Sequence, residues 1–511
     1  MRSLRLASFH PRANHRSDYA YMNPSLLDIL DPATADFVPP PTDAQGKTES
    51  HDGPLEAGER GTDLDASLRF AEAYADDLRH CPGIGWLYWD GRRWTSEGAE
   101  GHALECAKNS ARRWTEYWTR SNDESRGARV KDALTLEGGS HIRAVVALAI
   151  SDPRFVVTVA DLDRDSWSLN VLNGTLDLRT GKLRPHCRTD LITKIAAVNY
   201  VLGAQNPTLT RYLEMIERDT PGMAAFLARC FGAALTGDAE TETLFLLQGD
   251  GGSGKTTLVE AVAAMLGDYA VKIAFESLCQ SKHGRGPGSA SPDLVPLRGA
   301  RLAYASEGDV SARLDAGKVK ELTGNEPITA RALYQAPITF PQSWKLWLVS
   351  NFDPKADSDD TGIWRRMLKL HFGVIPEAQR DPAVKRALVN DPAARSALLA
   401  WAAAGCIDWQ ARGRGRIGLA PPDAVAAVTE AYRVKQDTLA EWWADLLVDT
   451  TLSPTAFTAG KDLRYHYENW CAENGAASVF MARFKAYLEA KGLVVDRRSG
   501  ARGWKGITFS K

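Results

Sequence analysis

The sequence predicts an α/β protein, in which a sheet of buried strands is covered by helices, with mainly helical segments before and after it. Two observations predict this class. Short apolar runs at 243–248, 301–306 and 345–350 lead into a glycine-rich loop, an acid and an amide in turn, and they are typical of strands of a buried parallel sheet. Segments with a helical period near 3.6 lie between and after them, at 257–267 and in the alanine-rich stretch 383–409.

Composition narrows the class of protein. The 511 residues suggest about three domains. A net charge of −2 gives the whole chain no electrostatic preference for nucleic acid, so any basic surface must be local. Seven cysteines without a CxxC pair argue against a disulfide framework and a structural zinc site, and favour a reducing cytoplasm. The basic N-terminus lacks an apolar signal core and no run of 18 apolar residues occurs, so we expect no secretory signal and no membrane partner.

The first part of the chain predicts a tail and then a small domain. Residues 1–66 are rich in proline, glycine and charge, which predicts a disordered tail, and 67–204 predict a mainly helical α+β domain. Asp-Gly within 86–94 predicts a β-hairpin, and 168–186 predict a β-meander. The Asp-x-Asp of 157–165 suits either a metal pair of a primase or a polar turn. No second acidic or histidine cluster matches it, so we favour the turn.

A glycine-rich loop at 249–257 predicts a phosphate site. Glycines let backbone N–H groups turn toward phosphate oxygens, and the following helix adds its unpaired N–H groups. A lysine can reach the β- and γ-phosphates, and a threonine hydroxyl can ligate Mg²⁺. The buried run before the loop and the helix after it supply the expected context. The predicted nucleotide-binding residues are Gly249, Asp250, Gly251, Gly252, Ser253, Gly254, Lys255, Thr256 and Thr257, with Thr256 on the metal.

Two further strand ends and an arginine pair predict hydrolysis. Glu307 follows the second apolar run, where a carboxylate can polarise the attacking water, and we also expect it near the metal. Asn351 follows the third run and could orient that water. Arg365 and Arg366 precede a fourth apolar run and could neutralise transition-state charge from a neighbouring subunit, although a structural ion pair is the alternative.

Two segments suit DNA. The stretch 319–344 predicts a hairpin whose cations, ring and amide could hold a strand, or which makes only protein contacts; its candidate residues are Lys320, Arg331, Tyr334 and Gln335. Residues 484–511 place a helix before two strands, which predicts a winged helix with a basic wing. From 483 to 511, eight Lys/Arg stand against two acids, and the candidates are Arg497, Arg498, Arg502 and Lys505. A solvated packing module is the alternative.

These motifs resemble one family. Six stretches of the sequence are similar to the phage/plasmid primase–helicase family, whose helicase part is a superfamily 3 helicase of the AAA+ type. They are LNVLNGTLDLRTGKLRPH, LARCFGAALTGD, LQGDGGSGKTTLVEAVAAMLGDYA, VKELTGNEPITARALYQAPITF, LWLVSN and GIWRRM. The resemblance covers about 160–375 strongly. It implies a P-loop ATPase core in a ring, usually hexameric, that moves 3′ to 5′ on single-stranded or forked DNA with ATP and Mg²⁺.

The resemblance also implies residue roles. Lys255 and Thr256 take the Walker A roles, Glu307 the catalytic acid and Asn351 the sensor. Arg366 best matches the arginine finger, with Arg365 close behind, and the hairpin matches the DNA-gripping loop. Ser306 stands where many relatives carry a second acid, which shifts the metal toward Thr256, water and phosphates. No convincing primase metal site is present, so priming is not supported.

We therefore expect a replicative DNA helicase of a phage, prophage or plasmid, acting in the bacterial cytoplasm. Its expected parts are an ATPase domain at 205–375, a helical subdomain at 376–435 and a winged-helix domain at 436–511. A replication initiator or loader that binds or melts origin DNA is the alternative, and an ATPase without a nucleic-acid role is a third. Whether a primase or polymerase acts in trans stays open.

Overall fold

We analysed a computed structural model, which describes residues 61–280, 292–306, 313–331, 337–357, 360–474, 478–498 and 500–509. Most of the predicted tail, residues 1–60, lies outside these ranges. The first described helix, α2, begins at Asp63 after Thr62, whose hydroxyl accepts a hydrogen bond from the Asp65 N–H and so caps the helix. No helix among the described residues is both long enough and apolar enough to cross a membrane.

Five parallel strands form the central sheet, in the order β13-β7-β12-β9-β8. The chain is therefore an α/β protein with a parallel sheet, as the apolar runs predicted. The sequence did not predict β8, because three residues are too few to show a periodic pattern. The strands are β7 Leu244–Gln248, β8 Ala270–Lys272, β9 Leu302–Ser306, β12 Lys345–Ser350 and β13 Met367–His371.

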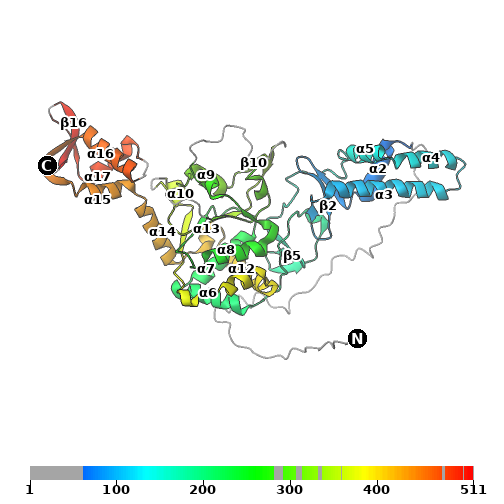
Figure 1. Cartoon of the computed structure of the whole chain (residues 1–511), viewed down its shortest axis with the longest axis horizontal. Coiled ribbons are helices and arrows are strands. Elements are labelled where there is room, and N and C mark those ends of the chain that lie inside the picture. The colour runs from blue at the N-terminus through cyan, green and yellow to red at the C-terminus, as the bar shows by residue number, and fades with distance from the viewer. Residues whose placement is uncertain are drawn as a thin grey trace, which may run out of the picture. The chain divides into compact units, whose positions relative to one another are not determined.

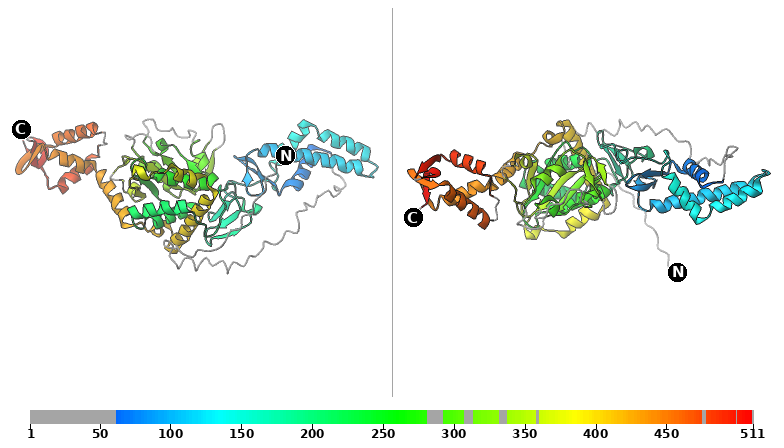
Figure 2. Two further views of the ribbon diagram at one scale, coloured as in Figure 1. Left: turned by 60° about the horizontal axis from the view of Figure 1, so that its bottom comes forward. Right: turned by 90° about the horizontal axis from the view of Figure 1, so that it is seen from above.

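Both faces of this sheet are buried, which explains why its strands read as unbroken apolar runs. Phe245 and Trp347 point to one face, where the helices α7 (Met223–Leu235), α8 (Lys255–Leu266) and α12 (Pro392–Ala411) pack. Phe231 of α7 stacks on Trp347 with 4.2 Å between ring centroids. Leu246 and Leu348 point to the other face. Figure 1 labels the helices of this part, and Figure 2 shows it from two further directions with the green strands through its middle.

The helices of this part follow the predicted pattern, with one break. The alanine-rich stretch is two helices rather than one, because Asp391 caps the second and Pro392 begins it. The helices are α6 Pro207–Asp219, α7 Met223–Leu235, α8 Lys255–Leu266, α9 Ala316–Thr323, α10 Thr361–Trp364, α11 Pro382–Asn390, α12 Pro392–Ala411, α13 Gly415–Leu419 and α14 Asp423–Lys435.

The predicted β-meander at 168–186 forms a three-stranded antiparallel sheet of β4 Ser168–Val171, β5 Gly174–Asp177 and β6 Lys182–Arg184. Leu169 and Leu176 belong to the same hydrophobic core as α7 and α12. The predicted boundary at 204 therefore falls inside one packed core. The Asp-x-Asp before it forms a turn: Asp161 accepts hydrogen bonds from Thr158, and Asp163 from Thr193. The described residues include no cluster of three metal-ligating side chains.

The residues before the meander form helices and a small sheet with their own core around Phe70, Trp86 and Phe155. The Asp90-Gly91 hairpin occurs as predicted, since β2 and β3 pair with Trp89 opposite Trp94. The elements are α2 Asp63–Tyr74, β1 Leu78–Cys81, β2 Gly85–Trp89, β3 Trp94–Thr95, α3 Ala99–Arg120, α4 Arg126–Leu136 and α5 Gly139–Ala149.

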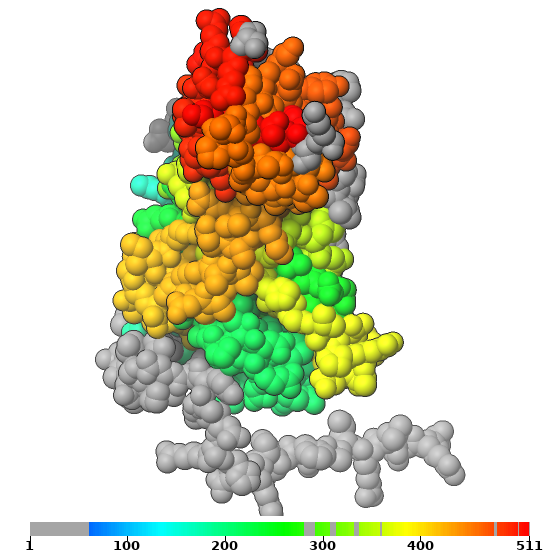
Figure 3. Space-filling model, turned by 90° about the vertical axis from the view of Figure 1, so that its left-hand side faces the viewer, coloured from blue at the N-terminus to red at the C-terminus, as the bar shows by residue number. Residues whose placement is uncertain are grey.

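The C-terminal residues 438–509 have a separate core centred on Trp442, Tyr467 and Phe484. Their surface is orange and red in Figure 3. The helix before the final two strands was predicted, but the strand β14 was not. The elements run α15 Thr438–Leu446, β14 Thr450–Ala459, α16 Gly460–Glu473, α17 Met481–Ala490, β15 Val494–Arg498 and β16 Ala501–Phe509, with sheet order β14-β16-β15.

Candidate functional site

The glycine loop 249–254 joins the end of β7 to the start of α8. Gly252 and Gly254 have φ angles of +83° and +88°, which side chains with a Cβ rarely adopt. A Cβ on Gly249 would lie only 2.3 Å from the Phe372 carbonyl oxygen. Backbone shape therefore requires glycine at 252 and 254, and close packing requires it at 249. The loop brings main-chain groups to the N-terminus of α8.

Lys255 is the first residue of α8, and its side chain is buried. Its Nζ donates to the carbonyl oxygens of Gly249 at 2.7 Å and Asp250 at 3.2 Å, and to Asn351 Oδ1 at 2.5 Å. The structure thus brings together the lysine and the amide that the sequence placed 96 positions apart. The reason is strand order, since β12 pairs with β7 in parallel and Ser350 lies opposite Gln248.

The remaining loop residues fit a phosphate group. Ser253 is buried, and its Oγ has no hydrogen-bond partner among the described residues. An orphaned buried hydroxyl beside main-chain N–H groups suits a ligand oxygen. Asp250, Gly251, Gly252 and the predicted metal ligand Thr256 are exposed, and Thr257 is half-buried.

Glu307, the predicted catalytic acid and metal ligand, lies outside the described residues. The strand before it is described: β9 ends at Ser306, which pairs with Val349 of β12. The roles predicted for Glu307 stay predictions.

The two arginines of the predicted finger differ in their surroundings. Arg366 is buried, and its Nη2 donates to Glu242 Oε2 at 2.9 Å. Arg365 lies 3.8 Å from the same carboxylate, but 66% of its side chain is exposed. Arg366 therefore makes the structural ion pair that was the alternative for this motif, while Arg365 faces solvent. Glu242 was not singled out from the sequence, because nothing in its neighbourhood marks it as the partner of residue 366.

The predicted hairpin is formed by β10 Ile328–Ala330 and β11 Ile338–Phe340, with Thr329 opposite Thr339. Arg331 follows β10 and is exposed, whereas Tyr334 and Gln335 lie outside the described residues. Lys320 lies on α9, and its Nζ pairs with Asp360 at 2.6 Å. Burial opposes the charge on Asp360, but the hydrogen bond from Lys320 and two backbone N–H groups keep the Asp360 pKa below its usual value. Lys320 is thus already engaged within the chain.

The predicted basic wing is the turn between β15 and β16. Arg497 lies directly opposite Arg502, Lys505 lies opposite Val494, and all of these cations are exposed. Arg498 is held by Asp496 at 3.2 Å and by the Thr455 carbonyl at 2.9 Å. Like charges placed opposite each other destabilise a strand pair. Neither Arg497 nor Arg502 has an ion-pair partner in the described part of the chain, so the wing favours an anionic ligand.

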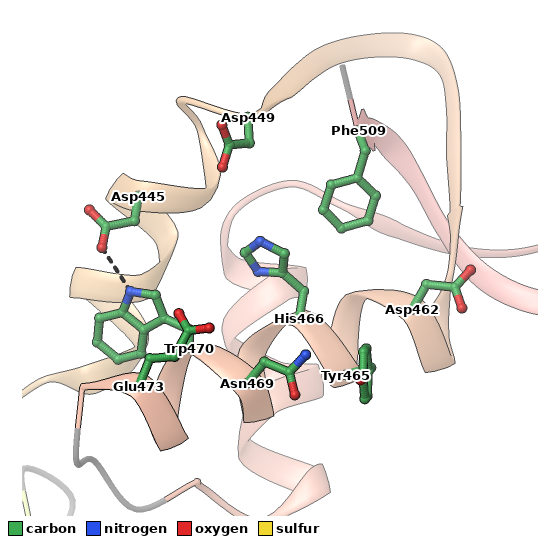
Figure 4. Close-up of a pocket in the computed structure, with 9 residues that line it drawn as sticks. All are labelled: Asp445, Asp449, Asp462, Tyr465, His466, Asn469, Trp470, Glu473 and Phe509. Carbon is green, nitrogen blue, oxygen red and sulfur yellow. Dashed lines mark hydrogen bonds between the residues drawn. The ribbon is translucent and has the colours of Figure 1, made fainter. Parts of the chain in front are cut away.

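Another surface of the C-terminal residues has the opposite charge. A cavity of about 570 Å³ borders α16, and Figure 4 shows its lining side chains. Four carboxylates line it, and no lysine or arginine does: the lining residues are Asp445, Asp449, Asp462, Tyr465, His466, Asn469, Trp470, Glu473 and Phe509. Asp445 accepts a hydrogen bond from the Trp470 indole at 2.7 Å. This surface would repel phosphate, so within residues 438–509 the wing suits an anionic ligand and the cavity does not.

Fold and site together define a class: an α/β protein with a parallel sheet, at one edge of which a glycine loop, a lysine and an asparagine meet. Two family models match the chain. "D5 N terminal like" matches residues 67–232, and a family of unknown function, DUF5906, matches 247–366. The second match spans the glycine loop, the hairpin and the arginine pair.

Named relatives come from large DNA viruses. The chain is 31% identical over 225 residues to L207/L206 of Acanthamoeba polyphaga mimivirus, named as a helicase, covering 43% of this chain and 23% of the relative. It is 27% identical over 333 residues to C962R of African swine fever virus, named as a primase, covering 62% and 34%. It is 29% identical over 260 residues to 022R of Frog virus 3, named as a helicase, covering 47% and 26%.

The chain is therefore similar to the primase–helicase replication proteins, and the resemblance of its motifs is confirmed at that level. The alignments span about a quarter to a third of these relatives' length. Among solved structures, the apo NrS-1 C-terminal region (305–718) covers 64% of this chain and 87% of its own at 13% identity, with a TM-score of 0.38. A likeness at that TM-score supports no statement about fold or function.

Proposed function

We propose that the chain is an ATP-dependent DNA helicase of replication, built on a P-loop ATPase core of the AAA+ type. The observation that carries this proposal is the contact between Lys255 and Asn351 beside the glycine loop. A cation and an amide brought together beside a glycine loop suit hydrolysis of a nucleoside triphosphate. The helicase and primase names of the relatives support DNA as the partner.

The residues around the loop suggest how ATP would be used. Bound ATP with Mg²⁺ would supply the phosphoanhydride bond whose hydrolysis drives the motor. The ammonium of Lys255 would leave the loop carbonyls and donate to the β- and γ-phosphates, and the Ser253 hydroxyl would gain a partner. Thr256 would hold the metal. Asn351 would orient the attacking water, and Glu307 would polarise it.

DNA contact is proposed at two places. The hairpin residues Arg331, Tyr334 and Gln335 would grip the translocating strand. The topology α15-β14-α16-α17-β15-β16 supports a winged helix, whose wing would carry Arg497, Arg498, Arg502 and Lys505 to backbone phosphates. A hexameric ring, a primase or polymerase in trans, and a phage, prophage or plasmid origin in a bacterial cytoplasm stay predictions, and the named relatives are viral.

The test is the ATPase rate with and without single-stranded DNA. We expect stimulation by DNA in the wild type, loss of the rate in Lys255→Ala, and a rate that no longer responds to DNA in Arg331→Ala. Lys272→Ala, an exposed lysine at the end of β8, is the matched control and should behave as wild type. A wild-type rate that ignores DNA would contradict the helicase and favour an ATPase without a nucleic-acid role.

A replication initiator or loader is the second candidate. The opposed arginines of the wing favour it, because a winged helix can bind duplex as well as single-stranded DNA. Footprinting on origin duplex separates the two candidates: protection of a defined sequence without unwinding of a forked substrate would support the initiator.

A further inference from the structure

The order of the strands distinguishes two flanks of the glycine loop. β7, which leads into the loop, lies between β12 and β13. On the β12 flank, Asn351 accepts a hydrogen bond from the Lys255 ammonium, so this flank holds the proposed phosphate chemistry. A nucleotide that points its terminal phosphate toward β12 must extend its base and ribose toward the other flank. That flank is bordered by the segment that follows β13.

Three side chains meet the loop on that second flank. A Cβ on Gly254 would lie 3.3 Å from Tyr212 Cε2 and 3.6 Å from Ile375 Cδ1. A Cβ on Gly252 would lie 2.6 Å from Arg380 Cζ and 2.9 Å from its Nη1. The guanidinium therefore packs against the loop backbone itself, next to a ring and an aliphatic side chain. Tyr212 comes from α6, before the sheet, and the other two follow its last strand.

Local hydrogen bonds hold these groups in place. Arg380 Nε donates to the Ile375 carbonyl at 2.8 Å, and the Arg380 N–H donates to the Glu377 carbonyl at 3.1 Å. The Tyr212 hydroxyl donates to the Gly254 carbonyl at 3.1 Å, and burial raises the Tyr212 pKa, which keeps the hydroxyl a donor. Lys385 of α11 pairs with Glu260 of α8 at 2.6 Å and ties the following helix to the loop's helix.

The charge on Arg380 is not used within the described chain. Its side chain is exposed, and no carboxylate pairs with it among the described residues. An exposed guanidinium fixed by its Nε presents a flat face. Such a face stacks well on an aromatic ring system.

We propose that Tyr212, Ile375 and Arg380 form the wall against which the nucleotide's base and ribose bind, with the Arg380 guanidinium stacked on the base. The assignment rests on the proposed nucleotide site and specifies its nucleoside half. Stacking contacts the plane of a base and not its edge, so adenine and guanine nucleotides use the wall alike.

Calorimetric titration of the full chain with Mg²⁺ and ADP, GDP or inorganic pyrophosphate tests the wall without hydrolysis. We expect Arg380→Ala to bind ADP and GDP roughly threefold to tenfold more weakly than wild type, the range of a cation–π contact, and pyrophosphate equally well. Arg380→Lys keeps the charge without the flat face, so it should restore little of the loss. Arg386→Ala removes an exposed arginine of α11 and should match wild type.

Four outcomes would overturn the wall. If pyrophosphate binding falls as much as ADP binding, or if Arg380→Lys restores ADP binding fully, Arg380 acts on phosphate charge. If ADP binding is unchanged in Arg380→Ala, the arginine only supports the loop. These three outcomes leave the proposed phosphate site standing. A wild type that binds neither ADP nor pyrophosphate would overturn the proposed function and the wall together.

Discussion

Arg365 and Arg366 show how much adjacent residues of one type can differ. Only 9% of the Arg366 side chain is exposed, and it pairs with Glu242, whereas 66% of Arg365 is exposed. A finger that completes a neighbour's site must extend into solvent in the isolated chain. The environment therefore favours Arg365 for that role, although the count along the sequence favoured Arg366.

Separate substitutions distinguish the two roles. We expect Arg365→Ala to lower the ATPase rate at least tenfold while leaving the thermal midpoint within about 1 °C, since surface changes rarely alter stability. Arg366→Ala should lower the free energy of unfolding by about 1–3 kcal/mol, because Glu242 loses a charged hydrogen-bond partner. Thermal melts and ATPase assays on both variants check this. If Arg366→Ala loses as much ATPase activity as Arg365→Ala and keeps the wild-type thermal midpoint, Arg366 is the better candidate for the arginine finger.

Lys345, at the start of β12, is a buried cation that connects the sheet to the end of α7. Its Nζ donates to the Thr236 carbonyl at 3.1 Å and to the Asp238 carbonyl. Burial lowers the pKa of Lys345 to about 7. Unfolding restores a lysine pKa near 10.5, so the unfolded chain binds one more proton than the folded chain between these values.

Stability should therefore rise with pH above about 7. We expect an increase on the order of 1 kcal/mol per pH unit from this group, measured as the free energy of unfolding in urea from pH 7 to 9. Lys345→Met should flatten that rise relative to wild type even if it lowers stability overall. The same slope in both proteins would show that Lys345 stays charged in the fold.

Among the elements, β14 explains the organisation of the C-terminal residues. It pairs with β16 through a register shift between Leu452 and Phe457, and Pro454 lies within that shift. Proline is tolerated in strands at edges and bulges, and β14 is an edge strand. With β14 in place, β16 becomes the central strand, and β15 lies at the opposite edge of the sheet.

The wing gives a prediction at this scale. Arg497→Ala and Arg502→Ala should each weaken binding to single-stranded or forked DNA, and each should reduce the slope of log affinity against log salt by about 1, because each cation releases about one counterion. Fluorescence anisotropy over a salt series measures both. Lys435→Ala, an exposed cation at the end of α14, is the matched control and should keep the wild-type slope. An unchanged slope in the wing variants would exclude phosphate contact there.

The described chain has separate hydrophobic cores, and their boundaries predict which C-terminal residues can be deleted without unfolding the sheet. The core of 438–509 contains no residue of the sheet, whereas Tyr432 of α14 is buried in the sheet's second core and packs on Trp364, with 5.0 Å between ring centroids. The last residue that the sheet needs therefore lies between Tyr432 and the start of α15.

Truncation tests this division. A chain ending after Asp437 should keep nucleotide binding and the basal ATPase rate within about twofold, and lose DNA affinity with the wing. A chain ending after Thr429 lacks Tyr432, and should be less stable by about 3–5 kcal/mol, as when a large aromatic leaves a core. Circular dichroism melts and nucleotide titrations distinguish the two. Loss of nucleotide binding in the longer chain would mean that 438–509 support the site directly.

Local patterns were enough to predict much of the fold and the loop. Apolar runs located β7, β9, β12 and β13, because strands buried on both faces leave no polar alternation. The spacing of the glycines ahead of Lys255 predicted a loop between a strand and a helix, and Gly252 and Gly254 there have φ angles that other residues rarely adopt. The strands β8 and β14 were not predicted from the sequence, because β8 has only three residues and the bulge in β14 interrupts its alternation.

The sequence by itself determined that this chain has a parallel α/β core, a glycine loop before a helix, and the motifs of the primase–helicase replication proteins. Only the tertiary structure decided which residues share a site. Strand order brings Asn351 to Lys255. Arg366 forms an ion pair with Glu242 inside the chain. The segment after β13 places Arg380 against Gly252. Periodicity and spacing are local properties of the chain, whereas these contacts join residues from about 95 to 130 positions apart and depend on how the sheet is ordered.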